Sequence, residues 1–229
     1  MKESKTFKKH QNYFKRGDTM KITAVAIMVV SLALFLFGWS YLSYIQFFVA
    51  MPAGIALLVV HFMTTAGEED IVRYAEKATE EISLAKLEES DRKKKPATTW
   101  APIATDGYEY PENVLVRRGK KGILRSSQYT KALLYPLDSG VGVMGTTVSV
   151  VSEQIENFST EIPYANIRSI SLAQEIHRIP VGKKSMSVTA HRLVIEYGEN
   201  ETLSVPMHDS VDTDAWIAKV QGLAEKSKT

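Results

Sequence analysis

The sequence predicts an α+β membrane protein: a two-helix transmembrane hairpin, a cytoplasmic helix, and a bent antiparallel sheet or barrel of strands closed by a C-terminal helix. Three observations predict this class. Two apolar runs stand almost back to back near the N-terminus, an amphipathic helical pattern follows, and the second half alternates apolar and polar residues with a period of two. The expected parts are a basic cytoplasmic tail (1–19), the hairpin (20–64), a cytoplasmic amphipathic helix (65–91), a linker (92–107) and a β domain (108–227).

The hairpin is predicted by the apolar runs 20–39 and 45–63, in which Lys21 is the one formally charged residue. Each run has about the ~20 residues that a helix needs to cross a hydrocarbon layer ~30 Å thick. Ala50 and Gly54 have the small-xxx-small spacing that lets two helices approach closely. We therefore expect these two residues at a contact between helices or between subunits.

The N-terminal tail is strongly basic. Lys and Arg beside a membrane segment stay on the cytoplasmic side, so both ends of the chain are expected in the cytoplasm. Aromatic residues lie between the basic ones, a composition that suits the surface of an anionic leaflet. The alternative is a topology signal that binds no particular lipid. The candidate lipid headgroup contacts in this tail are Lys8, Lys9, Lys15 and Arg16.

The helix after the hairpin carries a short apolar stripe at heptad spacing. Glu68, Glu69 and Asp70 precede it, where the N-terminal dipole of a separate helix favours acidic residues. Two interpretations stay open: the stripe makes a contact between subunits, or it packs on the chain's own domain. The residues of the stripe are Ile71, Ala75, Ala78, Ile82 and Ala85.

The β domain is predicted from alternating apolar positions separated by turn-forming residues, with roughly seven strands. The alternation shifts its parity between Ala190 and Leu193, which predicts a bulge or a bend in one long strand. The alternating positions include Val148 and Val150, Ile170 and Leu172, Met186 and Val188, Leu193 and Ile195, and Leu203 and Val205. The predicted turns lie at residues 118–122, 138–140, 181–184 and 198–200.

The last element is predicted to be an amphipathic helix over residues 215–226. Asp212, Thr213 and Asp214 form a cluster of N-cap residues in front of it. Trp216 and Val220 then fall on one helical face, together with Leu223 three residues further on. The helix is therefore expected to close the sheet.

This order of elements resembles the bacterial pleckstrin-homology-like domain over about the C-terminal half of the chain. The local match is the passage EIPYANIRSI at residues 161–170, because that family has an Ile-Pro-hydrophobic passage entering a strand at mid-domain. The resemblance implies a binding or assembly module rather than an enzyme. Similar domains are often joined to paired membrane helices in bacterial proteins, which implies a multi-pass protein of the bacterial inner (plasma) membrane.

Eukaryotic domains of this shape bind phosphoinositides through an early strand–loop–strand. By this resemblance, the corresponding basic residues are further candidate headgroup contacts, with a solvated hairpin as the alternative. They are Arg117, Arg118, Lys120 and Lys121.

No sequence motif in the chain predicts catalysis. The histidines form no HExxH pattern, and residues 182–185 lack the upstream glycine of a phosphate loop. The chain has no cysteine, which excludes disulfides and thiolate metal sites. A net charge of +2 suggests no nucleic-acid partner. We therefore expect no enzyme activity, cofactor or metal.

Three functions follow from these patterns. The favoured one is a structural or adaptor subunit, a homo- or hetero-oligomer whose β domain docks a protein on the cytoplasmic side. The second is a membrane-anchored module that senses anionic lipid. The third is a subunit of a multimeric channel or transporter, in which His61 near the end of the second apolar run would be the residue to watch.

Overall fold

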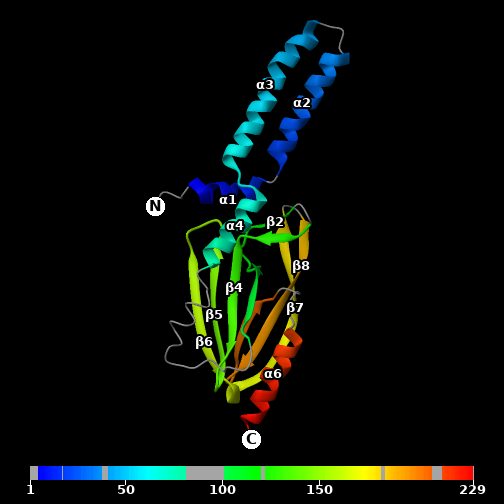
Figure 1. Cartoon of the computed structure of the whole chain (residues 1–229). Helices are drawn as coiled ribbons and strands as arrows, with labels where there is room; N and C mark the ends of the chain where they lie inside the picture. Colours follow the sequence, from blue (N-terminus) through cyan, green and yellow to red (C-terminus); the bar gives the residue numbers. More distant parts are fainter. Residues whose placement is uncertain are drawn as a thin grey trace. The chain divides into compact units, whose positions relative to one another are not determined.

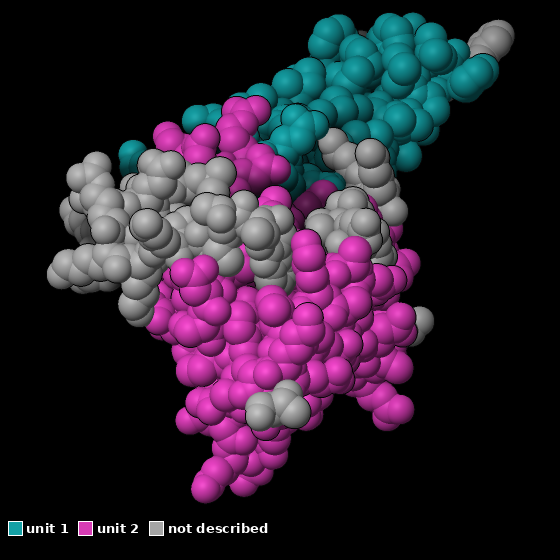
Figure 2. Space-filling model, turned by 60° about the horizontal axis from the view of Figure 1, so that its bottom comes forward, with its two compact units in different colours: residues 1–72 teal, residues 73–229 magenta. Residues whose placement is uncertain are grey.

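The computed structural model describes residues 5–16, 18–37, 41–80, 101–119, 122–181, 184–207 and 213–228. The chain divides into two compact units, Met1–Val72 and Arg73–Thr229 (Figure 2). Helices make up the first unit and strands dominate the second, which confirms the predicted α+β class (Figure 1). Residues 81–100, which hold Ile82, Ala85 and most of the predicted linker, lie outside the described residues.

The first unit contains helices α1 (Lys5–Arg16), α2 (Thr19–Phe37) and α3 (Tyr41–Thr64), and the start of α4 (Glu68–Thr79). Helices α2 and α3 run side by side in opposite directions (Figure 1). Each is long and apolar enough to cross a membrane, as predicted for the hairpin. The basic tail is not an extended segment, because most of it forms α1.

Helices α3 and α4 are separate helices. Helix α3 ends at Thr64, and α4 begins at Glu68. The Gly67 backbone N–H donates a hydrogen bond to the Asp70 carboxylate over 2.9 Å, which satisfies a donor at the entrance of α4. The acidic residues predicted to favour a new helix do lie in its first turn. The second apolar run therefore does not continue without a break into the next helix.

The second unit is built on two antiparallel sheets. The four-stranded sheet has the order β1-β4-β5-β6, and the three-stranded sheet has the order β7-β8-β9. A small pair, β2 with β3, surrounds the predicted turn at 118–122. The strands of the first sheet are β1 (Ile103–Glu109), β4 (Gln128–Pro136), β5 (Gly140–Ser149) and β6 (Ile155–Pro163). The remaining elements are β2 (Val116–Arg118), β3 (Leu124–Ser126), η2 (Tyr164–Asn166), β7 (Ile167–Val181), β8 (Lys184–Tyr197), β9 (Glu201–Pro206) and α6 (Thr213–Lys226).

One hydrophobic core joins both sheets to the C-terminal helix. Leu134 and Val143 enter it from the first sheet, Ile195 from the second, and Trp216 and Val220 from α6. The described residues form nine strands, against the roughly seven that alternation predicts; the two larger sheets hold seven of them and the short pair β2–β3 adds two. The helical face predicted for α6 is therefore the face that enters the core.

The passage at residues 161–170 forms the corner between the two sheets. Ile162 ends β6 in the core, Tyr164 begins the short helix η2, and Ile167 and Ile170 return to the core from β7. The Tyr164 hydroxyl donates to the Leu137 carbonyl over 3.2 Å. Burial raises the pKa of Tyr164, so the hydroxyl stays protonated and keeps this bond. The corner is thus held from the β4–β5 side as well.

The long ribbon of β7 and β8 contradicts the bulge, one of the two alternatives that the shift in parity predicts. The pairing runs without a shift from Ser169↔Glu196 to Val181↔Lys184, so no bulge lies between residues 190 and 193. What changes there is the buried face. Ile195 and Leu193 are buried on one face, whereas Arg192 and Val188 are buried on the other. Because strands twist, a long ribbon offers opposite faces to the core at its two ends.

Candidate functional site

Helix α1 separates the aromatic and the basic residues of the N-terminal segment onto opposite faces. Residues three or four positions apart share a helix face, and both sets follow that spacing. The aromatic residues that the sequence suggested for a leaflet surface are instead buried inside the protein. The buried side chains are Phe7, His10, Tyr13 and Phe14. The exposed basic side chains are Lys5, Lys8, Lys9, Lys15 and Arg16.

Two hydrogen bonds hold α1 against the end of α3. The Asn12 side-chain amide donates to the Thr64 carbonyl over 2.8 Å. The Ala66 backbone N–H donates to the Lys9 carbonyl over 3.2 Å. Thr64 is the last residue of α3 and Ala66 lies in the break before α4, so α1 contacts the chain on both sides of the end of α3.

The contact between α2 and α3 uses small residues. A Cβ atom added to Gly54 would lie 2.6 Å from Met28 Cγ and 3.1 Å from the Ala24 carbonyl oxygen. Ala24 is fully buried. The candidate contact residue Gly54 therefore serves packing inside the hairpin, and Ala50 is half-buried on the same helix. Close approach of two backbones is what small residues permit in membranes.

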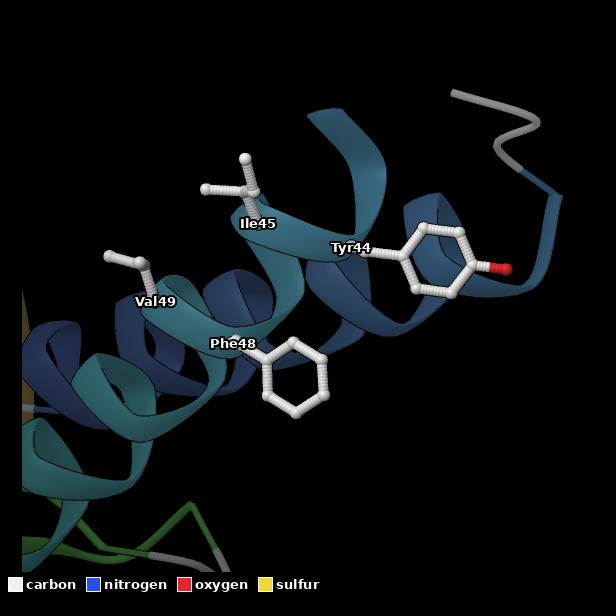
Figure 3. A pocket seen from close by; sticks show the side chains of 4 residues that line it. All are labelled: Tyr44, Ile45, Phe48 and Val49. Atoms are coloured by element: carbon white, nitrogen blue, oxygen red, sulfur yellow. The ribbon is translucent and has the colours of Figure 1, made fainter. Parts of the chain in front are cut away.

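The outer surface of the hairpin is apolar, and it carries an open groove on α3. Tyr44, Ile45, Phe48 and Val49 line this groove. Tyr44 and Phe48 point to one side of the helix, and Ile45 and Val49 point to another (Figure 3). The tyrosine hydroxyl is the one polar side-chain group among the four. A groove of this kind suits hydrocarbon and offers no chemistry for catalysis.

The stripe on α4 is largely buried in the isolated chain. Ile71 and Ala75 are fully buried, and Ala78 is half-buried. Thr79 is buried beside them and returns a hydrogen bond to the Ala75 carbonyl over 2.9 Å. Neither Ile82 nor Ala85 belongs to the described residues.

The basic pair β2–β3 is tied to its neighbours. Arg125 donates to the Tyr108 hydroxyl over 2.9 Å, and its guanidinium lies 5.7 Å from the centre of that ring. The Arg118 guanidinium lies 4.0 Å from the sulfur of Met186 on β8. Arg117 is half-buried. The structure therefore shows these arginines in protein contacts, and Lys120 and Lys121 lie outside the described residues.

Among the described residues of the second unit, Arg192 is the most buried charged residue, with 9% of its surface exposed. It makes an ion pair with Glu109 of β1 over 2.5 Å. It also donates to the Ser204 hydroxyl over 2.6 Å and to the Ser204 carbonyl over 3.0 Å. The Glu175 carboxylate lies 3.7 Å away. A buried charge requires such partners. Arg192, on β8, therefore links its own strand to β1, β7 and β9, and it does not form an empty ligand site.

Tyr110, the residue after Glu109, connects the end of β1 with β3. Its hydroxyl donates to the Leu124 carbonyl over 2.9 Å, and its ring centre lies 5.7 Å from that of His177. Burial, assisted by the neighbouring Tyr108 and Glu109, raises the pKa of Tyr110 to about 12. The hydroxyl is therefore neutral at physiological pH and acts as a hydrogen-bond donor.

Two exposed apolar side chains on β7 were missed by the sequence analysis. Leu172 is 47% exposed and Ile176 is 70% exposed. Leu172 was expected to share the buried face with Ile170, but the covered face changes at this point of the ribbon. The two residues are four positions apart on one strand, so they share a face and lie about 13 Å apart. The one signal in the sequence for this exposed pair is that Leu172 and Ile176 are four positions apart, which places them on the same face of a strand.

Across the part of the chain that the structure describes, no group of three or more His, Asp or Glu residues is placed to hold a metal ion. The two membrane-length helices and the strand-rich unit define an α+β protein that combines a helical hairpin with two packed sheets. Comparison of the chain with protein-family models, curated proteins and solved structures finds no significant match.

Proposed function

We propose that this protein is a non-enzymatic adaptor subunit of a bacterial inner membrane, anchored by α2 and α3 with both termini in the cytoplasm. Its strand domain docks a protein partner. The outward apolar surface of the hairpin supports the anchor, since it suits lipid rather than water. The basic residues around α1 and Lys21 support the cytoplasmic side for the N-terminus.

The docking role rests on the exposed pair Leu172 and Ile176. Leu172 and Ile176 are two large apolar side chains that are exposed on the same face of one strand, with the exposed Gln174 between them, and exposed apolar side chains gathered on one face mark an interaction surface more than scattered ones do. The strand that carries them is fixed by its pairing with β8 and by two side chains that reach its carbonyls. Gln221 donates to Ile170, and Lys228 donates to Ile167. The surface is therefore preorganised, which lowers the cost of binding.

A pleckstrin-homology-like arrangement is part of this proposal. Support comes from a four-stranded and a three-stranded antiparallel sheet that share one core with a C-terminal helix. Further support is the Ile-Pro passage, which forms the corner between the sheets. Such a domain would serve as a platform for a partner rather than as a catalyst.

The test is purification of the full-length chain from its native membranes in a mild detergent, with quantification of co-purifying proteins. We expect a stoichiometric partner, and we expect the double variant Leu172→Ser, Ile176→Ser to reduce its recovery at least tenfold. Both side chains are exposed, so the variant should fold and melt like the unaltered protein.

The matched control is Ile123→Ser with Ile155→Ser, because these two residues are exposed to a similar degree elsewhere, Ile123 just before β3 and Ile155 at the start of β6. The control should retain the partner. Equal loss in both double variants would show general stickiness instead of a docking surface. A chain that purifies alone, with no partner in either case, would refute the adaptor function.

A further inference from the structure

The exposed basic face of α1 has a defined direction within the first unit. Asn12 is the residue whose side chain reaches the end of α3. Lys8 and Lys9 lie four and three positions before it, and Lys15 and Arg16 lie three and four positions after it. Residues at these spacings share a helix face. The four cations therefore surround the contact with α3, on the side of α1 that faces the hairpin, and all four are exposed.

The opposite face of α1 carries the aromatic residues, and it is buried. A helix that inserts into a bilayer does so with its apolar face. In α1 that face is occupied by protein packing, so the helix has no exposed apolar face with which to insert. What remains for the bilayer is the basic face, next to the end of a helix long enough to span it.

We infer that the basic face of α1, formed by Lys8, Lys9, Lys15 and Arg16, is a binding surface for the headgroups of anionic phospholipids. The inference rests on the membrane placement of α2 and α3 in the proposed function and on nothing else in it. Lys21, exposed in the first turns of α2, adds a further cation at the same end of the hairpin. Anionic lipid is the complementary partner for such a cluster beside a membrane helix.

The geometry gives this binding a structural consequence. The helix α1 that carries the cations also holds Thr64 and Ala66, on the two sides of the end of α3. Headgroups that fix α1 at the bilayer surface therefore also fix the joint from which α4 departs. Anionic lipid should stabilise the folded chain, because a ligand that binds only the native state raises its stability.

The same cations have a second physical effect that the experiment must separate. Positive side chains near the C-terminal end of a helix interact favourably with its dipole. If Lys8, Lys9, Lys15 and Arg16 served α3 in this way alone, their loss would lower stability to the same extent with and without anionic lipid. A headgroup site instead makes the loss depend on the lipid.

The experiment uses the full-length protein in a non-ionic detergent, titrated with phosphatidylglycerol or with phosphatidylcholine. Melting is followed by tryptophan fluorescence, and bound lipids are counted by native mass spectrometry. We expect phosphatidylglycerol to raise the melting temperature and phosphatidylcholine to leave it nearly unchanged. Replacing the four cations by Gln should weaken the apparent affinity for phosphatidylglycerol at least about tenfold, since each surface cation strengthens such binding about fivefold.

The matched control removes the same charge elsewhere, with Arg168→Gln, Arg178→Gln, Lys219→Gln and Lys226→Gln, all exposed on the strand domain. It should keep the response to phosphatidylglycerol. A third variant, Arg117→Gln with Arg118→Gln, should also keep it. Loss of the response in this third variant would place the headgroups on β2–β3 and would overturn the inference.

Other outcomes are equally decisive. An equal shift with phosphatidylcholine would show that the negative charge of the headgroup is not recognised, and an equal shift with inorganic phosphate at the same concentration would show that a lipid is not needed; either result would overturn the inference. Persistence of the effect at about 1 M salt would contradict an exposed electrostatic contact. Alkaline extraction of membranes tests the anchor separately. A chain that resists extraction yet ignores phosphatidylglycerol refutes this inference alone, whereas a chain that is released refutes the membrane placement as well.

Discussion

The hairpin and the strand domain are packed with opposite polarity. In α2 and α3 the exposed side chains are large and apolar, whereas the buried ones include Ala24, Ser31 and His61. In the strand domain the largest fully buried side chains are Leu, Ile and Val, and the surface is mainly polar. A helix in lipid gains little by burying a leucine against another helix, so small residues that permit close packing take the inner positions. This opposite polarity is what the proposed membrane placement of α2 and α3 predicts.

The difference predicts opposite responses to the same substitution. Leu134→Ala in the strand core should lower the free energy of unfolding by about 2–5 kcal/mol, because it removes a fully buried side chain and leaves a cavity. Leu34→Ala on the outer face of α2 should lower it by less than about 0.5 kcal/mol in detergent. Denaturant titration of the purified full-length protein measures both. Equal losses would mean that the outer face of α2 is buried against protein.

Close packing inside the hairpin makes a prediction of intermediate size. Gly54→Val should destabilise the hairpin by about 1–3 kcal/mol, because the new side chain overlaps Met28 and the Ala24 backbone. The matched control is Ala53→Val, one position away on an exposed face. Denaturant titration of the full-length protein in a non-ionic detergent measures both variants. Equal losses in Gly54→Val and Ala53→Val would contradict a close contact at residue 54.

The smallest effect concerns Tyr110 at the margin of the strand domain. Tyr110→Phe should cost about 1 kcal/mol, because the Leu124 carbonyl loses its donor. The folded pKa of about 12 lies above the ordinary value of 10, so the protonated form is favoured in the folded state. The stabilisation is complete below pH 10 and is lost as the pH rises through 12. Phenolate absorbance measured during an alkaline titration should show one late-ionising group fewer in the variant.

Local signals predicted the elements whose surroundings follow from their own sequence. The apolar runs, the turns at 138–140 and 198–200 and the face of α6 that carries Trp216 are found where the sequence places them, and the described ends of the other two predicted turns join paired strands. Gly122 and Gly198, which lie in two of those turns, have positive φ angles that glycine adopts without strain. The remaining features of the fold depend on which part of the protein covers each face of a helix or strand. Leu172 continues the alternation of Ile170, yet no local pattern reveals where a twisted ribbon changes its covered face.

The N-terminal segment shows the same limitation from another side. Its basic charge predicts a signal that flanks a membrane segment. The helical spacing of Phe7, His10 and Phe14 also predicts one buried face of a helix, but the lysines are the stronger signal in the sequence. The part-buried hydrogen bond from Asn12 to Thr64 joins residues 52 positions apart, so a short sequence window cannot contain both partners. The candidate docking pair on β7 was missed for a related reason, because exposure is a property of the whole fold.

The break between α3 and α4 has a practical consequence for anyone who labels or immobilises this protein. Because α1 is hydrogen-bonded to Thr64 and Ala66, the N-terminal helix restrains the break between α3 and α4, which lies 50 to 60 positions further along the chain. A fluorescent protein or affinity tag fused in front of Lys5 would be attached directly to α1 and would disturb its contact with the end of α3. A fusion placed after α6 would leave α1 unaltered, so measurements on it would describe the native break between α3 and α4.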